Sequence, residues 1–132
     1  MAEGLMGLRI YQMAEALADE IWEEVIGWRP FARDTVGRQL VEAADSIGGN
    51  IAEGYGRYSY KENRHFQLYA RGSLHETRHW IRRAQARKLM TDVRCKELTA
   101  KVEELAPQLN AYIRTLERRS RDRKPKERQE SP

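Results

Sequence analysis

Residues 46–57 read SIGGNIAEGYGR, and the four glycines in this stretch raise the question of a phosphate-binding loop. A P-loop needs GxxxxGK[ST], with a lysine that reaches the phosphates, and the stretch has no such lysine. A dinucleotide-binding loop needs GxGxxG between a strand and a helix, whereas Gly54 and Gly56 are followed by Ser59 and preceded by no predicted strand. Neither kind of loop fits.

A helix fits the stretch better. The apolar residues before and within it recur every three or four positions: Val36, Leu40, Ala44, Ile47 and Ile51. We expect Gly48, Gly49 and Ala52 to let a neighbouring helix approach closely, although each glycine costs about 1 kcal/mol in helix propensity. Gly54 and Gly56 suit the C-terminal end, where a left-handed residue closes a helix. The sequence therefore predicts a helix over 35–55.

Three further segments show the same periodicity. The segment 5–26 has an apolar stripe of Ile10, Ala14, Leu17, Ile21 and Val25. The segment 60–87 has a predicted inward face of Phe66, Ala70, Ser73, Thr77, Ile81 and Ala84. The segment 92–118 has Leu98, Val102, Leu105, Leu109, Tyr112 and Leu116. The predicted N-terminal caps are Asp34, Ser59 in a capping box with Glu62, and Thr91 or Asp92.

Four such segments joined by short links predict an all-α protein, an antiparallel up-down four-helix bundle. Pro107 lies inside the last segment, and because the apolar stripe continues on both sides of it, we expect a kink rather than an end. Trp22, Ile26 and Leu68 lie off the main stripes and are available for another subunit.

Composition and charge limit the possibilities further. The chain of 132 residues suits one domain, and no apolar run is long enough to cross a bilayer. The N-terminal residues show no secretory signal, and Cys95 is the single cysteine, so we expect a cytoplasmic protein. Residues 118–132 hold seven basic and three acidic residues, whereas the preceding 117 hold 17 of each. We therefore expect a four-helix bundle over 1–117 and a basic, disordered tail over 118–132.

Two ordered motifs in this chain resemble a known family. The matching positions are Ser46, Ile47, Asn50, Ile51, Ala52, Glu53 and Gly54, then Arg71, Gly72, Ser73, Leu74 and Glu76. The pattern resembles the four-helix-bundle proteins encoded in intervening sequences of bacterial 23S ribosomal RNA genes. Those proteins are similar to the accessory variability proteins of diversity-generating retroelements. This chain has Gly48-Gly49 where the family usually has Pro-Ala.

The resemblance implies a bundle that assembles into a ring, typically a homopentamer, and binds nucleic acid. It supplies no catalytic reaction. We expect a protein that is not an enzyme and that has no cofactor.

Residues 75–79 read HETRH and match the HExxH signature of zinc proteases. The two histidines share a helix face, but no third ligand follows, and His65 is about 15 Å away along the helix. The ExxH pairs ending at His65 and His79 resemble di-iron ligands, yet both lie on one helix, about 21 Å apart. We expect neither metal site.

Asn50, Glu53 and Glu76 lie near apolar stripes and are interpreted as a structural polar network.

The segment from Arg57 to Lys88 carries nine basic residues against Glu62 and Glu76. Four of its arginines fall on one helix face with Tyr60 in line: Arg64, Arg71, Arg78 and Arg82. This basic ridge is suited to phosphates of RNA or DNA, with Tyr60 stacking on a base. The alternative is a protein–protein adaptor or scaffold, in which the basic segment pairs with the acidic residues of 5–26 during oligomerisation.

Overall fold

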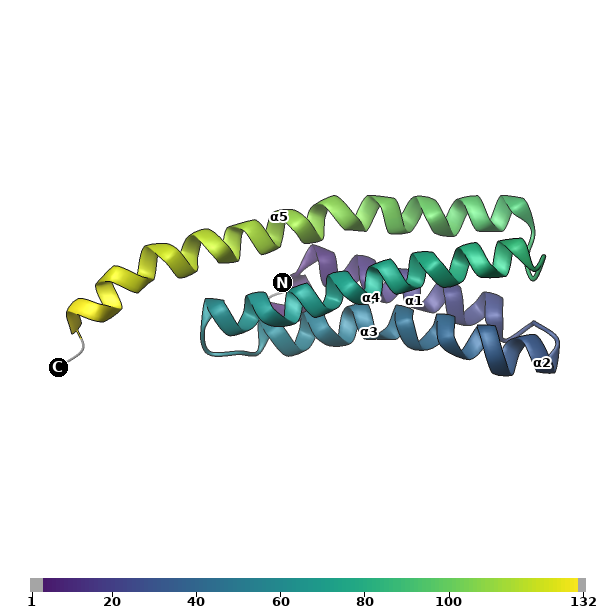
Figure 1. The fold of residues 1–132 in the computed structure, drawn as a ribbon, viewed down its shortest axis with the longest axis horizontal. Coiled ribbons are helices and arrows are strands. Elements are labelled where there is room, and N and C mark those ends of the chain that lie inside the picture. Colours follow the sequence, from purple (N-terminus) through teal and green to yellow (C-terminus); the bar gives the residue numbers. More distant parts are fainter. Residues whose placement is uncertain (1–3, 131–132) are drawn as a thin grey trace.

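The computed structural model describes the backbone of residues 4–130 and the side chains of residues 4–122. The elements in chain order are η1 (Gly4–Gly7), α1 (Arg9–Val25), α2 (Pro30–Ala32), η2 (Arg33–Gly37), α3 (Arg38–Tyr55), α4 (Tyr60–Ala86) and α5 (Asp92–Glu130). The part of the chain that the structure describes contains no strand, so the all-α prediction is confirmed (Figure 1).

The four long helices α1, α3, α4 and α5 lie side by side around one apolar core (Figure 1). Helix α3 packs against α1 and α4, and α5 packs against the same two helices. Each long helix contributes fully buried side chains to the core, among them Leu17, Ile47, Leu74 and Leu105. The apolar stripes predicted for α1, α3 and α5 are buried in this core, apart from the half-buried Tyr112. Among the described residues, no helix combines the length and the apolar character that crossing a bilayer requires.

The helical path into α3 begins earlier than predicted. It starts at Pro30, which suits a first helical position because the amide hydrogen it lacks would have had no partner there. Residues Arg33–Gly37 then form a π turn, so Asp34 lies inside a helical segment and its predicted role as an N-terminal cap is wrong. Gly37 ends this turn close to α1, where an added Cβ would lie 2.6 Å from Cγ1 of Val25.

The predicted caps of the last two helices are confirmed. Ser59 precedes α4, and its Oγ accepts the backbone N–H of Glu62 at 3.1 Å. Thr91 precedes α5, and its Oγ1 accepts the backbone N–H of Arg94 at 3.1 Å. Both bonds satisfy amides that a helix start leaves without an internal partner.

The left-handed residue that closes a helix is found on α4 rather than α3. Lys88 has φ of 58°, and the next residue, Leu89, donates its N–H to the carbonyl of Ala84 at 2.9 Å, as in a Schellman motif. Gly56 has φ of −79°, so the predicted left-handed end of α3 is wrong.

The glycines of α3 differ in what they contact. Gly48 is buried, but an added Cβ would lie 3.8 Å from Cβ of Ala14 on α1, an ordinary van der Waals distance, so the predicted close approach of a helix does not depend on glycine there. Gly49 has nothing within 4 Å of that position. Gly54 is buried against α4, where a Cβ would lie 2.7 Å from Nε2 of Gln67. The second half of α3 is therefore close-packed against α4 at Gly54 and more open toward α1.

The inward face predicted for α4 is wrong in part, although four of its residues are buried as predicted: Ala70, Thr77, Ile81 and Ala84. Phe66 and Ser73 are half-buried, whereas Asn63, Gln67 and Leu74 are buried. The prediction followed the apolar ring of Phe66 and passed over two polar side chains that the core accommodates.

Helix α5 runs through Pro107 without ending, as predicted, and curves along its length (Figure 1). It continues to Glu130, twelve residues beyond the predicted end at 118, so the backbone over 118–130 is helical where a disordered tail was expected. Arginine, lysine, glutamate and glutamine, which dominate this stretch, have high helix propensities.

Candidate nucleic-acid interface

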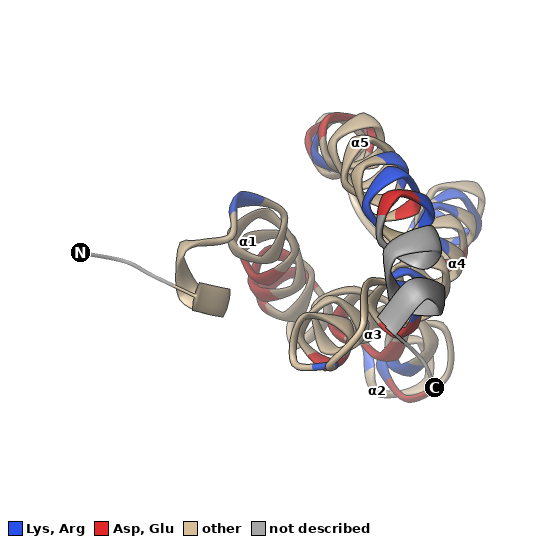
Figure 2. Ribbon diagram, turned by 90° about the vertical axis from the view of Figure 1, so that its left-hand side faces the viewer, with Lys and Arg blue, Asp and Glu red and all other residues tan. Residues whose placement is uncertain are grey.

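Basic residues are concentrated on one helix and acidic residues on another, and these two helices lie on opposite sides of the bundle. Helix α4 and its flanking turns carry nine basic and two acidic residues between Arg57 and Lys88. Helix α1 carries five acidic residues and one basic residue. Figure 2 shows the contrast, with blue side-chain positions on α4 and red ones along α1. Because α3 and α5 pack between them, these two surfaces face different directions.

Three of the four predicted ridge arginines lie along the border between α4 and α5. Their contacts with α5 are Arg64 Nε to Glu117 Oε1 at 2.9 Å, Arg71 Nη1 to Asn110 Oδ1 at 3.3 Å, and Arg78 Nε to Glu103 Oε1 at 2.8 Å. The side chains of Arg64 and Arg78 remain 33% and 27% exposed. These two guanidinium groups are therefore partly neutralised within the protomer.

Arg82 differs from the other three. It is exposed, and no side chain among residues 4–122 forms an ion pair or a hydrogen bond with it. It borders an open depression of about 470 Å³ on the surface of α4, whose lining is His75, Arg78, His79, Arg82, Arg83 and Ala86. Every polar side chain in this lining carries nitrogen donors, and none is a carboxylate. We name this the His–Arg depression; its lining of nitrogen donors suits phosphate oxygens.

Sequence reasoning did not include His79 or Arg83 in a nucleic-acid site. These two residues lie four positions apart, one turn of the helix, on the solvent side of α4. This one-turn spacing is the sequence signal that could have identified them as part of the site. The π turn and the caps play no part in this site.

Tyr60 stands at the first position of α4 and is half-buried. Its ring lies 5.7 Å from Cζ of Arg119 on α5, a cation–π distance. The tyrosine is therefore in contact with α5, and its predicted stacking on a base stays a prediction.

The HExxH residues do not assemble a metal centre with others in the described part of the chain. His75 and His79 are exposed on one face, and His75 Nδ1 lies 2.9 Å from Nη1 of Arg78. No cluster of three histidine, cysteine, aspartate or glutamate side chains suited to a metal ion exists among the described residues.

The predicted polar network is not formed by Asn50, Glu53 and Glu76. Asn50 donates to the carbonyl of Ser46 one turn earlier, at 2.9 Å. Glu53 is exposed and pairs with Arg57 at 2.6 Å. Glu76 is exposed. All three lie on helix surfaces, so nothing in this arrangement fixes the register between helices.

A buried polar network exists instead between α3, α4 and α5. Gln67 Nε2 donates to the carbonyl of Ile51 at 3.1 Å and to Oδ1 of Asn63 at 2.9 Å. Asn63 Nδ2 donates to the hydroxyl of Tyr112 at 3.0 Å, and burial raises the pKa of that tyrosine. Gln67 Oε1 is buried without a partner. The spacing of Asn63 and Gln67 with Ala70 puts both on the buried face of α4, but the partners that satisfy them lie on α3 and α5.

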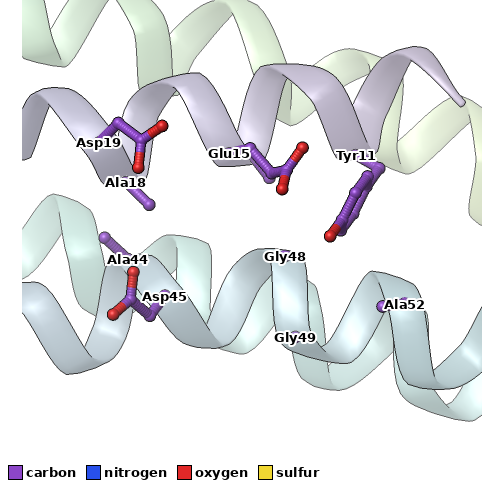
Figure 3. A pocket seen from close by; sticks show the side chains of 10 residues that line it. Tyr11, Glu15, Ala18, Asp19, Ala44, Asp45, Gly48, Gly49 and Ala52 are labelled. Atoms are coloured by element: carbon purple, nitrogen blue, oxygen red, sulfur yellow. The ribbon is translucent and has the colours of Figure 1, made fainter. Parts of the chain in front are cut away.

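A groove of about 260 Å³ separates α1 from α3 (Figure 3). Its floor is made of small residues: Ala14, Ala18, Ala44, Gly48, Gly49 and Ala52. Its rim carries Glu15 and Asp19 from α1, with Asp45 facing them from α3. Burial and the nearby charge of Asp19 raise the pKa of Asp45, and burial together with a hydrogen bond to Glu15 raises the pKa of Tyr11. The groove is acidic, in contrast to the His–Arg depression.

Comparison with solved structures supports the fold. The chain is similar to a crystal structure from Bacteroides thetaiotaomicron that is described as a protein of unknown function from the S23 ribosomal protein family. The TM-score is 0.71 at 17% identity, and the match covers 79% of this chain and 97% of that one. No curated protein matches this chain.

Comparison with family models assigns the chain to a family. The model for the 23S rRNA-intervening sequence protein matches residues 6–111. This range includes the SIGGNIAEG and RGSLHE motifs, all of α1, α3 and α4, and more than half of the bundle portion of α5. Since the match spans most of the chain, this protein belongs to the 23S rRNA-intervening sequence protein family.

Proposed function

We propose that this protein is a non-catalytic module that binds RNA or DNA through the phosphates, without sequence preference. The observation that carries the proposal is the His–Arg depression on α4, where exposed donors gather without a carboxylate in the lining. Nitrogen donors from arginine and histidine are the groups that bind phosphate oxygens, and such contacts do not read the bases.

The ridge arginines on the α5 border contribute to the same surface. The ion pairs of Arg64 and Arg78 are partly exposed, and such a pair is worth about 1 kcal/mol or less. An incoming phosphate can therefore compete with Glu117 and Glu103 for these guanidinium groups. Arg71 and Arg82 are more exposed and provide the first contacts.

The functional unit in this proposal is a cyclic homo-oligomer of five antiparallel up-down bundles in the cytoplasm. The family resemblance supports the ring, and so do the exposed apolar side chains of Trp22 and Ile26, which are 51% and 49% accessible. A ring would repeat a weak contact several times, and the resulting avidity would compensate for a low affinity per protomer. The relation to the accessory variability proteins of retroelements belongs to the same proposal.

The test is a salt titration of binding to RNA and to DNA. Wild-type affinity is expected to fall steeply with salt, with a log–log slope of several units, since each bound phosphate releases counterions. Arg71→Glu with Arg82→Glu should weaken binding and reduce the slope. Arg29→Glu with Arg38→Glu is the charge-matched control, because both arginines are exposed and lie outside α4. If the two double variants bind RNA and DNA equally well, the assignment of the binding site to α4 is wrong.

A second function is favoured by the acidic groove between α1 and α3. In this alternative the protein is an adaptor, and α4 of one copy pairs with α1 of the next. Light scattering distinguishes the two: the Arg71 and Arg82 double variant would then dissociate, and wild-type protein would not retain RNA. Metal analysis addresses catalysis, since the absence of stoichiometric zinc from the purified protein would rule out an enzyme that uses His75 and His79 as zinc ligands.

A further inference from the structure

An exposed aromatic patch lies at the end of the bundle where α3 turns into α4. We define it as Arg57, Tyr58, Phe66 and Tyr69. The Tyr58 side chain is 99% exposed and that of Tyr69 is 58% exposed. Burying apolar surface is favourable in water, so two tyrosines left this accessible within twelve residues require an explanation.

Three members of the patch, Arg57, Phe66 and Tyr69, are ordered by contacts with one another, whereas Tyr58 extends into solvent beside Arg57 in the sequence. Cζ of Arg57 lies 4.6 Å from the centre of the Phe66 ring, and Glu53 pairs with the same guanidinium at 2.6 Å. Phe66 and Tyr69 meet edge to face, with ring centres 5.6 Å apart. A guanidinium held over a ring, next to further rings, is an arrangement that stacks on nucleobases.

Phosphate-binding groups lie on the other flank of the same helix. Arg64 and Arg71 point toward α5, whereas the contact with Arg57 places Phe66 on the flank toward α3. At about 100° per residue, Gly72 lies between Tyr69 and Arg71 around α4, and nothing stands within 4 Å of its missing Cβ. A strand crossing there meets no side chain from Gly72. The helix diameter of about 10 Å then separates phosphate contacts from base contacts.

We propose that this end of α4 binds single-stranded nucleic acid, with unpaired bases stacked on the aromatic patch and phosphates on the arginine flank. The inference rests on the proposed function and names its substrate class. Only unpaired bases can stack in this way, because the bases of a duplex already stack on one another. Between Tyr55 and Arg71 the chain has four basic residues and one acidic residue, so charge favours the same ligand.

The experiment compares three probes of equal length, about 16 nucleotides: an oligouridylate, a duplex and an abasic oligonucleotide that keeps the phosphates but lacks bases. Wild-type protein should bind the oligouridylate most tightly. Tyr58→Ala with Tyr69→Ala should weaken that binding by about tenfold and leave the abasic probe unaffected. Tyr58→Phe with Tyr69→Phe should bind as wild type does, because the rings remain. Phe31→Ala is the control, since Phe31 is 83% exposed and α2 lies at the opposite end of the bundle (Figure 1).

The outcomes separate the two proposals. Equal binding of all three probes, unchanged in the double alanine variant, overturns the stacking patch and leaves phosphate binding in place. Binding of no probe overturns both. A fall in molar mass of the double alanine variant in light scattering assigns the patch to a protein contact and overturns the inference as well.

Discussion

Gly54 of α3 lies so close to Asn63 of α4 that an added Cβ would come within 2.8 Å of the Asn63 carbonyl oxygen. The neighbouring Gln67 amide would be 2.7 Å away. A backbone atom cannot move aside as a flexible side chain can, so the two helices hold this separation only because residue 54 has no side chain. Helix packing thus explains why residue 54, the last glycine of the SIGGNIAEG motif, is a glycine.

Gly54→Ala should therefore destabilise the protein, although alanine is the better helix former. Forcing a methyl group into a packed contact typically costs about 1–3 kcal/mol. Urea denaturation measures the free energy of unfolding, and an unchanged or higher value would show that α3 and α4 separate without cost.

Gly72→Ala should act in the opposite direction. Nothing lies within 4 Å of the added methyl group, so helix propensity alone applies and should raise the free energy of unfolding by up to about 1 kcal/mol. Gly49→Ala should behave in the same way, for the same reason. Destabilisation of a monomeric preparation by either substitution would contradict this account.

Tyr112→Phe should lower stability because it removes the hydroxyl that accepts from Nδ2 of buried Asn63. A buried donor left without a partner costs about 1–3 kcal/mol. Tyr69→Phe is the matched control, since its ring is largely exposed and its hydroxyl makes no bond with the described residues. Equal denaturation midpoints for the two variants would exclude a stabilising role for the Asn63–Tyr112 bond.

Lys88→Gly should stabilise the turn between α4 and α5. Lys88 has φ of 58°, a conformation that costs a residue with a Cβ about 1–2 kcal/mol and costs glycine almost nothing. Lys88→Ala removes the same charge but keeps the Cβ, so it should not gain this stability. A melting temperature that rises equally in both variants would point to charge as the cause.

Asp45→Asn should stabilise the protein at neutral pH and have little effect in acid. Burial beside Asp19 raises the pKa of Asp45, so the folded state takes up the proton more readily than the unfolded chain. The stability linked to that proton is present below the usual pKa of aspartate and is lost as the pH rises through the raised value. Melting at about pH 3 and pH 7 tests the difference. Glu42→Gln, on α3 but outside the groove lining, is the control.

Local signals in the sequence predicted most of the fold. The apolar stripes of α1, α3 and α5 and the caps at Ser59 and Thr91 depend on residues within one or two helical turns, and the structure confirms them. The polar part of the inward face of α4 was missed because the buried Gln67 is satisfied by a carbonyl of α3, sixteen residues away. That partner cannot be read from the spacing on α4 alone.

The basic surface was predicted less completely. Helical spacing placed the four arginines on one face, but the partners of Arg64 and Arg78 lie 53 and 25 residues further along the chain. Their partial neutralisation follows from how α5 is placed beside α4. The same spacing could have identified Arg83, since its place beside the exposed His79 depends only on α4.

The π turn over Arg33–Gly37 has a consequence for the family. A π turn contains one residue more than an α-helical turn, so it takes up an inserted residue while the helix on either side keeps its inward face. A relative that lacks one residue here would retain the same bundle with an uninterrupted helix. Length differences of a single residue among members of the family should therefore gather at this position, and gaps placed elsewhere in α3 would turn its apolar stripe away from the core.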